Sequence, residues 1–309
     1  MGLLHLPNSL QKAALSLTIS LHYSIMNNLS KAARIFYGLA VVGLGIQQLA
    51  YGRFIPALLP AWPGRIPGIF LWASLVGAVL LAAGAAIVFN QKVGLLSLMV
   101  GVLLLSLLCF SHVPYELLAD PYSDHLGSWT NAFTALALAG GALTMAGIYW
   151  EESSQLEASL ARSTFASRVI VLGRLCFCTT IVSYGICHFL YTKYISPLVP
   201  TWIPYPTFWT HFTGVALFGA GSAITLGIRR RTSALLLGTM VFLWVIVLHL
   251  PRVINASLPT RPGELSSLLE AIAYAGTAFA IATAHSGKNG VTPSPISATL
   301  FARKEEMQS

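Results

Sequence analysis

Eight apolar stretches, separated by short polar or proline-rich segments, dominate the pattern along the chain. Each is long enough, or nearly so, for the roughly 20 residues that a spanning helix needs, and none shows the alternation of a barrel strand. Because hydrocarbon offers no partner to a backbone N–H or C=O, such stretches must satisfy their own hydrogen bonds as helices. The pattern predicts an all-α integral membrane protein with eight transmembrane helices, near 35–51, 69–89, 93–111, 130–149, 169–190, 208–228, 232–250 and 267–284.

The same pattern occurs twice along the chain. GIQQLAYGRFIPALLPAW, at 45–62, aligns with GICHFLYTKYISPLVPTW, at 185–202. Each copy holds four apolar stretches, an even number, so the copies run parallel and are related by an axis along the membrane normal. We therefore predict two parallel four-helix-bundle repeats. The register continues downstream, where it pairs Trp72 with Trp209, Gly77 with Gly214, Gly84 with Gly221, His112 with His249 and Pro114 with Pro251.

The repeat also predicts how the chain is divided. Residues 1–25 lack a tidy signal-peptide cleavage site and are interrupted by His22, so they are either an interfacial segment or a stretch upstream of a start at Met26. We expect an N-terminal extension, a first repeat, a cytoplasmic linker that forms a short surface helix, a second repeat and a disordered Ser/Pro/Gly-rich tail, at 1–33, 34–150, 151–168, 169–285 and 286–309.

Charge is scarce and unevenly distributed. The chain is 55% hydrophobic and 9% charged, with a formal net charge of +8. With eight spans, most lysines and arginines fall on the side that carries both termini, including the run Arg229, Arg230 and Arg231. Because lysine and arginine mark the cytoplasmic face, we expect an inner (cell) membrane protein with both termini in the cytoplasm. The basic run is interpreted as a topology signal, so the expected partner is the lipid bilayer and not nucleic acid.

Glycines recur on one face of the second and sixth apolar stretches. Gly77 and Gly84 lie seven residues apart, which is two turns along a helix, and Gly214 with Gly221 repeats the spacing. Helices in lipid associate through close backbone contact at small residues. The spacing predicts helix-packing faces in preference to a cofactor groove.

The connections after the first and fifth helices are apolar but broken by prolines. Such segments cannot span, so we expect them in the outer interface, where Trp62 and Trp202 suit the aromatic belt. Two interpretations are open: an interfacial anchor, or a lid over a lipid-accessible pocket that a quinone or a lipid tail enters sideways. In the second interpretation the two tryptophans, with Arg252, are the candidate cofactor-binding residues.

Side chains that could carry chemistry gather at the same outer face. His112 and His249 each stand two positions before a proline, where imidazole can shuttle protons or hydrogen-bond a quinone carbonyl; the alternative is a helix-end histidine that bonds backbone freed by the proline. Glu270 lies about one turn inside the last helix, where a carboxylate needs a partner or a wet cavity. His249 and Arg252 are its expected partners, as a proton-transfer dyad or as a structural ion pair. The candidate catalytic residues are His249, Glu270 and His112.

The sequence lacks the motifs of several common enzyme classes. The four cysteines form no C-x-x-C and no zinc spacing, and the chain has no G-x-G-x-x-G, P-loop, H-E-x-x-H or G-x-S-x-G. Nucleotide binding, zinc hydrolysis, serine catalysis and thiol–disulfide exchange are therefore disfavoured, and no metal site is expected.

Each repeat resembles the DoxX-like membrane family. The resemblance covers roughly 34–147 and 174–283 and rests on an arginine at the start of the first helix, a proline-rich aromatic loop, a glycine-bearing second helix and H-x-P at the end of the third. These features are Arg34, Pro56 to Pro67, Gly77 with Gly84 and His112 with Pro114 in the first copy, and Arg174, Pro197 to Pro206, Gly214 with Gly221 and His249 with Pro251 in the second.

The resemblance implies a role in membrane redox chemistry without a catalytic motif to carry over. The family takes its name from a membrane subunit of a thiosulfate:quinone oxidoreductase, which implies a quinone-interacting subunit that works with a redox partner subunit. Two other functions stay open, a non-catalytic scaffold for a partner complex and a transporter of a small solute or lipid. The sequence does not define the oligomeric state.

Overall fold

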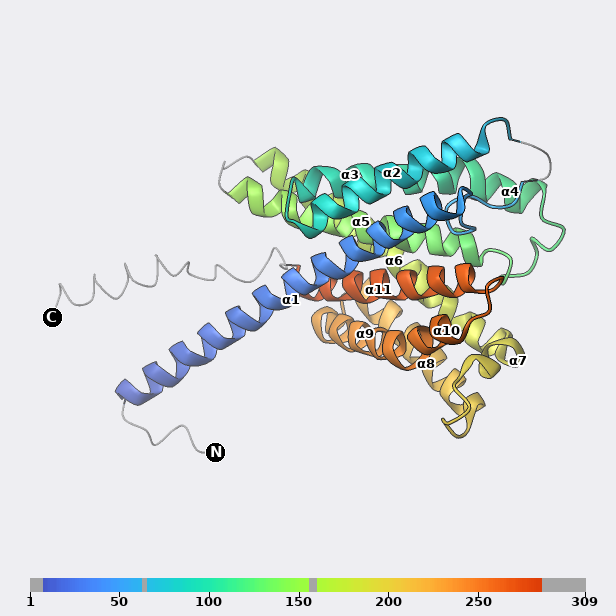
Figure 1. Cartoon of the computed structure of the whole chain (residues 1–309). Helices are drawn as coiled ribbons and strands as arrows, with labels where there is room; N and C mark the ends of the chain where they lie inside the picture. The colour runs from blue at the N-terminus through green and yellow to red at the C-terminus, as the bar shows by residue number, and fades with distance from the viewer. Residues whose placement is uncertain (1–7, 63–65, 156–159, 285–309) are drawn as a thin grey trace.

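The computed structural model describes residues 8–62, 66–155 and 160–284, and within these ranges the chain is helical, with no β-strand. Eight long helices form one bundle (Figure 1). They are α1 (Asn8–Tyr51), α2 (Ile69–Val88), α3 (Val93–Leu107), α5 (Thr130–Gln155), α6 (Leu160–Leu190), α8 (Pro206–Leu226), α9 (Arg230–Trp244) and α11 (Arg261–Thr283). Short elements join them: the π-helices η1 (Leu108–His112) and η3 (Val245–His249), the 3₁₀-helix η2 (Ser196–Leu198), and α4 (Val113–Leu118), α7 (Thr192–Ile195) and α10 (Leu250–Asn255).

Seven helical spans in the described residues are long and apolar enough to cross a membrane. They comprise α1, α2, α3 with its continuation through α4, α5, α6, α9 with α10, and α11. This confirms the prediction of an all-helical chain with several membrane-spanning-capable helices. The remaining long helix, α8, has 21 residues, but Thr210, His211 and Thr213 in its first turns lower its mean hydropathy.

The two helices that end the predicted repeats, α5 and α11, lie at the centre of the bundle. Within their apolar windows 83% and 67% of residues are buried, against 22% to 44% in the other spans. Each long helix packs on the next one in chain order, α11 closes the ring by packing on α1, and α5 also packs on α11. These contacts follow the same order in both halves. If α1, α2, α3 and α5 are replaced in turn by α6, α8, α9 and α11, and the reverse, the same pairs of helices are in contact.

The bundle has two distinct ends. The connections that follow α1, α4, α6 and α10 lie at one end, which we call the proline-rich end (right in Figure 1). The end of α5 and the start of α6 lie at the opposite end, together with the last turn of α11 (left in Figure 1). At that opposite end Arg34 donates to the carbonyl oxygens of Ile87 and Val88, at 2.6 and 2.7 Å, and so ties α1 to the last turn of α2.

The predicted packing faces of α2 and α8 are confirmed by backbone distances. A Cβ atom on Gly77 would lie 3.1 Å from the carbonyl oxygen of Gly45 in α1, and one on Gly214 would lie 3.2 Å from that of Gly185 in α6. A larger residue at either position would push against backbone. Each face extends to a further contact, at Gly84 against Gly38 and at Gly221 against Cys178.

The crossing of α5 and α6 is another close backbone contact. A Cβ atom on Gly140 or on Gly173 would lie 2.6 Å from the carbonyl oxygen of the other glycine. The corresponding crossing of α11 on α1 places Gly276 against Ala33, with the built Cβ 2.9 Å from the alanine carbonyl oxygen. Small residues thus bring the two central helices against the helices that begin each half.

Two segments of the predicted division continue the long helices. The projecting first part of α1 is continuous with the rest of that helix from Asn8 to Tyr51, so the described part of the 1–33 extension is helical (Figure 1). The linker 151–168 is shared between the end of α5 and the start of α6 instead of forming a separate surface helix. The tail at 286–309 lies outside the described residues.

Replacement of Gly173 by alanine should destabilise the bundle. The new Cβ would lie 2.6 Å from backbone atoms of Gly140 and Thr144, so α5 and α6 would have to separate, at a cost of roughly 1–3 kcal/mol. The matched control is Gly219→Ala on α8, where a Cβ meets nothing within 4 Å and helix propensity alone gives a gain of up to about 1 kcal/mol. Thermal unfolding in detergent measures both variants, and equal melting temperatures would contradict the close crossing.

Candidate functional site

The third long helix does not end at His112, as the sequence pattern suggested. It passes through η1, in which the backbone winds more widely, and continues beyond Pro114 as α4. Pro114 has no N–H to offer the carbonyl four residues earlier, and the π-helical register absorbs this loss without ending the helix. Helix α9 repeats the arrangement: it continues through η3 and α10, around His249 and Pro251. Short π-helical segments of this kind are frequent at functional sites.

His112 is fully buried at the proline-rich end, and neither of its ring nitrogens has a hydrogen-bond partner. The ring faces the backbone of Ala57 and Leu58, in the loop that follows α1. It therefore does not satisfy the alternative suggested by the sequence, in which it would bond backbone freed by the proline. A buried imidazole without a well-formed hydrogen bond is costly, which keeps His112 a candidate functional residue.

The loop over His112 is folded against the helix ends. Within this loop the side chains of Ile55 and Leu58 are buried. Trp62, a predicted cofactor-binding residue, donates from Nε1 to Oγ of Ser111 at 3.1 Å, and its ring meets that of Tyr115 edge-on with centroids 5.6 Å apart. Trp62 thus fastens the loop to η1 and α4.

A cavity of about 450 Å³ lies between this loop, the start of α2 and α4. Glu116 is 2% exposed, and its Oε2 has no hydrogen-bond partner. In the cavity wall the Glu116 carboxyl interacts with the side chain of Asp120. The lining combines apolar side chains with polar ones: Phe54, Pro56, Leu59, Pro60, Ala61 and Ile69 on the one hand, and Arg53, Tyr115, Glu116, Asp120, Ser128 and Asn131 on the other.

Glu116 was missed from the sequence. The signal that could have found it is the run HVPYE, which places the carboxylate four residues after His112 and therefore on the same helix face. The apolar pattern predicts a helix that ends near 111, which leaves Glu116 beyond the helix. The continuation of the helix through η1 and α4 is what brings Glu116 under the cavity.

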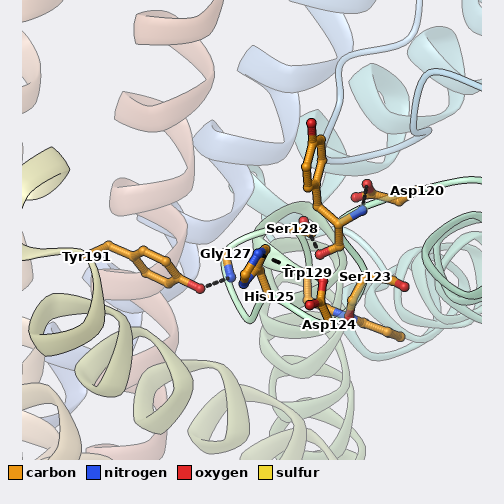
Figure 2. Close-up of polar contacts among 9 residues, drawn as sticks. Asp120, Ser123, Asp124, His125, Gly127, Ser128, Trp129 and Tyr191 are labelled. Atoms are coloured by element: carbon orange, nitrogen blue, oxygen red, sulfur yellow. Dashed lines mark hydrogen bonds and ion pairs between the residues drawn. The ribbon is translucent and has the colours of Figure 1, made fainter.

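The loop between α4 and α5 forms the rim of the cavity and is held by its own hydrogen bonds (Figure 2). Asp120 Oδ1 accepts from the backbone of Tyr122 at 2.8 Å, and Trp129 Nε1 donates to the carbonyl oxygen of Ser123 at 2.9 Å. The backbone N–H of Gly127 donates to the hydroxyl of Tyr191, at the end of α6, at 2.9 Å. This hydrogen bond connects the α4–α5 loop of the first half to the end of α6 in the second half.

The corresponding region of the second half is built around an ion pair. Arg252 binds Glu264 through two hydrogen bonds, Nε to Oε2 at 2.7 Å and Nη2 to Oε1 at 2.5 Å. In the register that pairs His112 with His249, Arg252 corresponds to Tyr115, which lines the cavity of the first half. The ion pair therefore occupies, in the second half, a region that borders a cavity in the first.

The expected pairing of Glu270 with His249 or Arg252 is not formed. Among the described residues the ion-pair partner of Arg252 is Glu264, and His249 is half-buried with its Nδ1 unpartnered. The reason is the start of α11 at Arg261, six residues before the predicted boundary. Glu264 consequently occupies the first turn, and Glu270 lies about 9 Å deeper along the helix.

The loop over the second half also differs from its counterpart. Trp202, the other predicted cofactor-binding tryptophan, is 71% exposed, and α7 and η2 contain no buried residue. Figure 1 shows α7 and the segment after it projecting from the proline-rich end. The structure therefore separates the predicted residues into a first-half group with His112 and Trp62, a second-half group with His249 and Arg252, an exposed Trp202, and a deeper Glu270.

Removal of either partner of the ion pair should destabilise the second half. Arg252→Met leaves the Glu264 carboxylate, whose side chain is 20% exposed, without its partner, and Glu264→Leu does the converse, each at roughly 1–3 kcal/mol. The double variant should recover part of that loss because no charge is then left unpaired. Thermal unfolding of the four proteins closes the cycle. Strictly additive costs would mean that the two side chains do not interact.

One family model matches the chain, that of a domain of unknown function (DUF8561), over residues 177–272. The matched stretch runs from within α6 to within α11 and contains His249, Arg252, Glu264 and Glu270. No curated protein and no solved structure matches the chain. The similarity therefore falls in the second half and does not include the cavity around Glu116.

Proposed function

We propose that this protein is a quinone-interacting membrane subunit that acts with a redox partner subunit. The observation that supports the proposal is the cavity at the proline-rich end, which is lined by the buried Glu116, with one unpartnered carboxyl oxygen, together with six apolar and five other polar residues. Small-molecule sites characteristically combine an apolar lining with a few convergent polar groups.

The lining suits an amphiphilic ring with oxygen substituents. Phe54, Leu59 and Ile69 provide apolar contact, while Glu116 and Ser128 provide polar contact to carbonyl or hydroxyl oxygens. Ile69, at the start of α2, is 40% exposed on the outside of the bundle. A molecule dissolved in the lipid therefore has a sideways path to the cavity.

The chemistry assigned to this chain is proton handling. Reduction of a quinone to a quinol takes up two electrons and two protons. In the proposal Glu116 donates one proton to the quinone oxygen, is reprotonated by His112, one helical turn away, and then donates the second proton by the same route. The electrons come from the redox partner subunit.

The same proposal includes eight spans in two parallel DoxX-like repeats, with α8 as the eighth. Two observations support it: the exchange of helices leaves the packing contacts unchanged, and α8 packs between α6 and α9 as α2 packs between α1 and α3. Lys92 and Arg231 lie at the end opposite the proline-rich one, which by the positive-inside rule is cytoplasmic. Both termini are then cytoplasmic, in the inner membrane.

The purified protein should carry quinone, and Glu116→Leu should lose it. Solvent extraction followed by chromatography measures the content, and titration with a short-chain quinone measures the affinity, which should fall about 2–10-fold because a hydrogen bond from a protonated carboxyl to a carbonyl oxygen contributes roughly 0.5–1.5 kcal/mol. Asp124→Asn is the matched control, since this carboxylate is exposed and does not line the cavity. Wild-type protein with no more quinone than an unrelated membrane protein purified alongside would refute the proposal and favour a scaffold.

Labelling from outside should place the two ends of α8 on opposite sides of the membrane. Thr201 precedes α8 and Thr232 follows it, and both are exposed. In intact cells a membrane-impermeant maleimide should label Thr201→Cys above the wild-type background, whereas Thr232→Cys should react only after permeabilisation. Labelling of both variants in intact cells would show that α8 does not cross.

A further inference from the structure

Glu270 lies deep inside the bundle, where helices of the two halves meet. It is the tenth residue of α11, which places it about 14 Å from the first residue of that helix. Its neighbours come from α6 and from its own helix: it interacts electrostatically with Tyr184 and Tyr274. The cavity around Glu116, in the first half, does not include any of these residues.

Hydroxyl and carbonyl oxygens gather around this carboxyl. The hydroxyls of Thr134, on α5, and Tyr184, on α6, are 2.6 Å apart, and Tyr184 also donates to the carbonyl oxygen of Thr130 at 3.2 Å. The ring of Tyr274 lies beside that of Tyr184, with centroids 6.3 Å apart. Three helices thus bring neutral oxygens to one place.

The Tyr274 hydroxyl is the unexplained member of this group. The side chain is 8% exposed, and the hydroxyl has no hydrogen-bond partner although it lies close to those of Thr134 and Tyr184. A buried hydroxyl normally finds a partner. The unpartnered hydroxyl beside this oxygen cluster is therefore a candidate ligand for a further bound atom.

The charge of the Glu270 carboxylate indicates the charge that such a bound atom must carry. Within the described residues no lysine, arginine or histidine forms an ion pair with Glu270, and Arg252 and Glu264 satisfy each other six residues further out. The titratable groups near Glu270 are Tyr184, Tyr274 and Cys187, of which Cys187 interacts with Tyr184. A single negative charge in this interior needs one compensating positive charge.

We infer that Glu270, Tyr184, Tyr274 and Thr134 form a binding site for one monovalent cation, either a proton or Na⁺, between the two halves of the bundle. One carboxylate among neutral oxygens balances a charge of one and offers too little charge for a divalent ion, which usually binds through several carboxylates. Glu270 as a whole is only partly buried, which leaves the site a route for exchange of the cation. Because the oxygens come from α5, α6 and α11, occupancy of the site fixes the first half against the second.

Two readouts on the purified protein test the site and separate the sources of charge. Bound Na⁺ predicts that the melting temperature rises with NaCl and reaches a plateau, relative to choline chloride at the same ionic strength. A bound proton predicts no sodium effect, together with an infrared carbonyl band of a protonated carboxyl. In Glu270→Gln whichever signal the wild type shows should disappear, whereas Asp124→Asn, with its exposed carboxylate, should retain it.

Tyr274→Phe removes only one hydroxyl and serves as the second variant if Glu270→Gln does not fold. It should shift the sodium midpoint to higher concentration or shift the frequency of the carboxyl band. Wild-type protein that shows an ionised carboxylate at this position and no response to sodium would overturn the inference, as would a Tyr274→Phe protein identical to wild type in both readouts. Neither readout depends on quinone, so these results are independent of the proposed function.

Discussion

The structure depends on backbone contact between helices at small residues. Lipid is as apolar as leucine, so burial of apolar side chains gives little drive to association within a membrane, and close approach must supply it. At the α5–α6 crossing this approach is so close that Gly140 and Gly173 leave no room for a methyl group. Once α5 and α11 are held in the centre in this way, the side chains at both ends of the bundle have fixed positions.

The two halves share a framework and differ in the chemistry that the framework carries. Both have a π-helical segment that ends in histidine before a proline. Beyond it, the first half has a carboxylate under a cavity, while the second has an arginine bound to a glutamate. The tips of the two halves therefore carry different polar groups on similar backbones.

Apolar periodicity and glycine spacing predicted most of the framework, because both report directly on burial in lipid. The positions of α2 and α9 and the glycine faces could be predicted in this way. Helix ends were less predictable where polar residues begin a helix, as at Arg261, or where a proline is accommodated, as at Pro114. Those two boundaries account for the expected partners of Glu270 and for the omission of Glu116. The different burial of the loops at Leu58 and Leu198 could not be predicted, because the local residues are nearly the same.

The π-helical segment before His112 has a consequence for how the tip of this helix can change. Successive residues of an α-helix are rotated by about 100° around its axis, so the one-residue surplus in η1 determines the azimuth of every side chain beyond it. A deletion of a single residue within Leu108–His112 would leave the membrane-spanning part of α3 intact and turn α4 as a rigid body. Glu116 would then point to another side of the helix. The extra residue in η1 therefore determines the direction in which the side chains of α4 point. Evolution can change that direction without changing the length or the apolar character of α3.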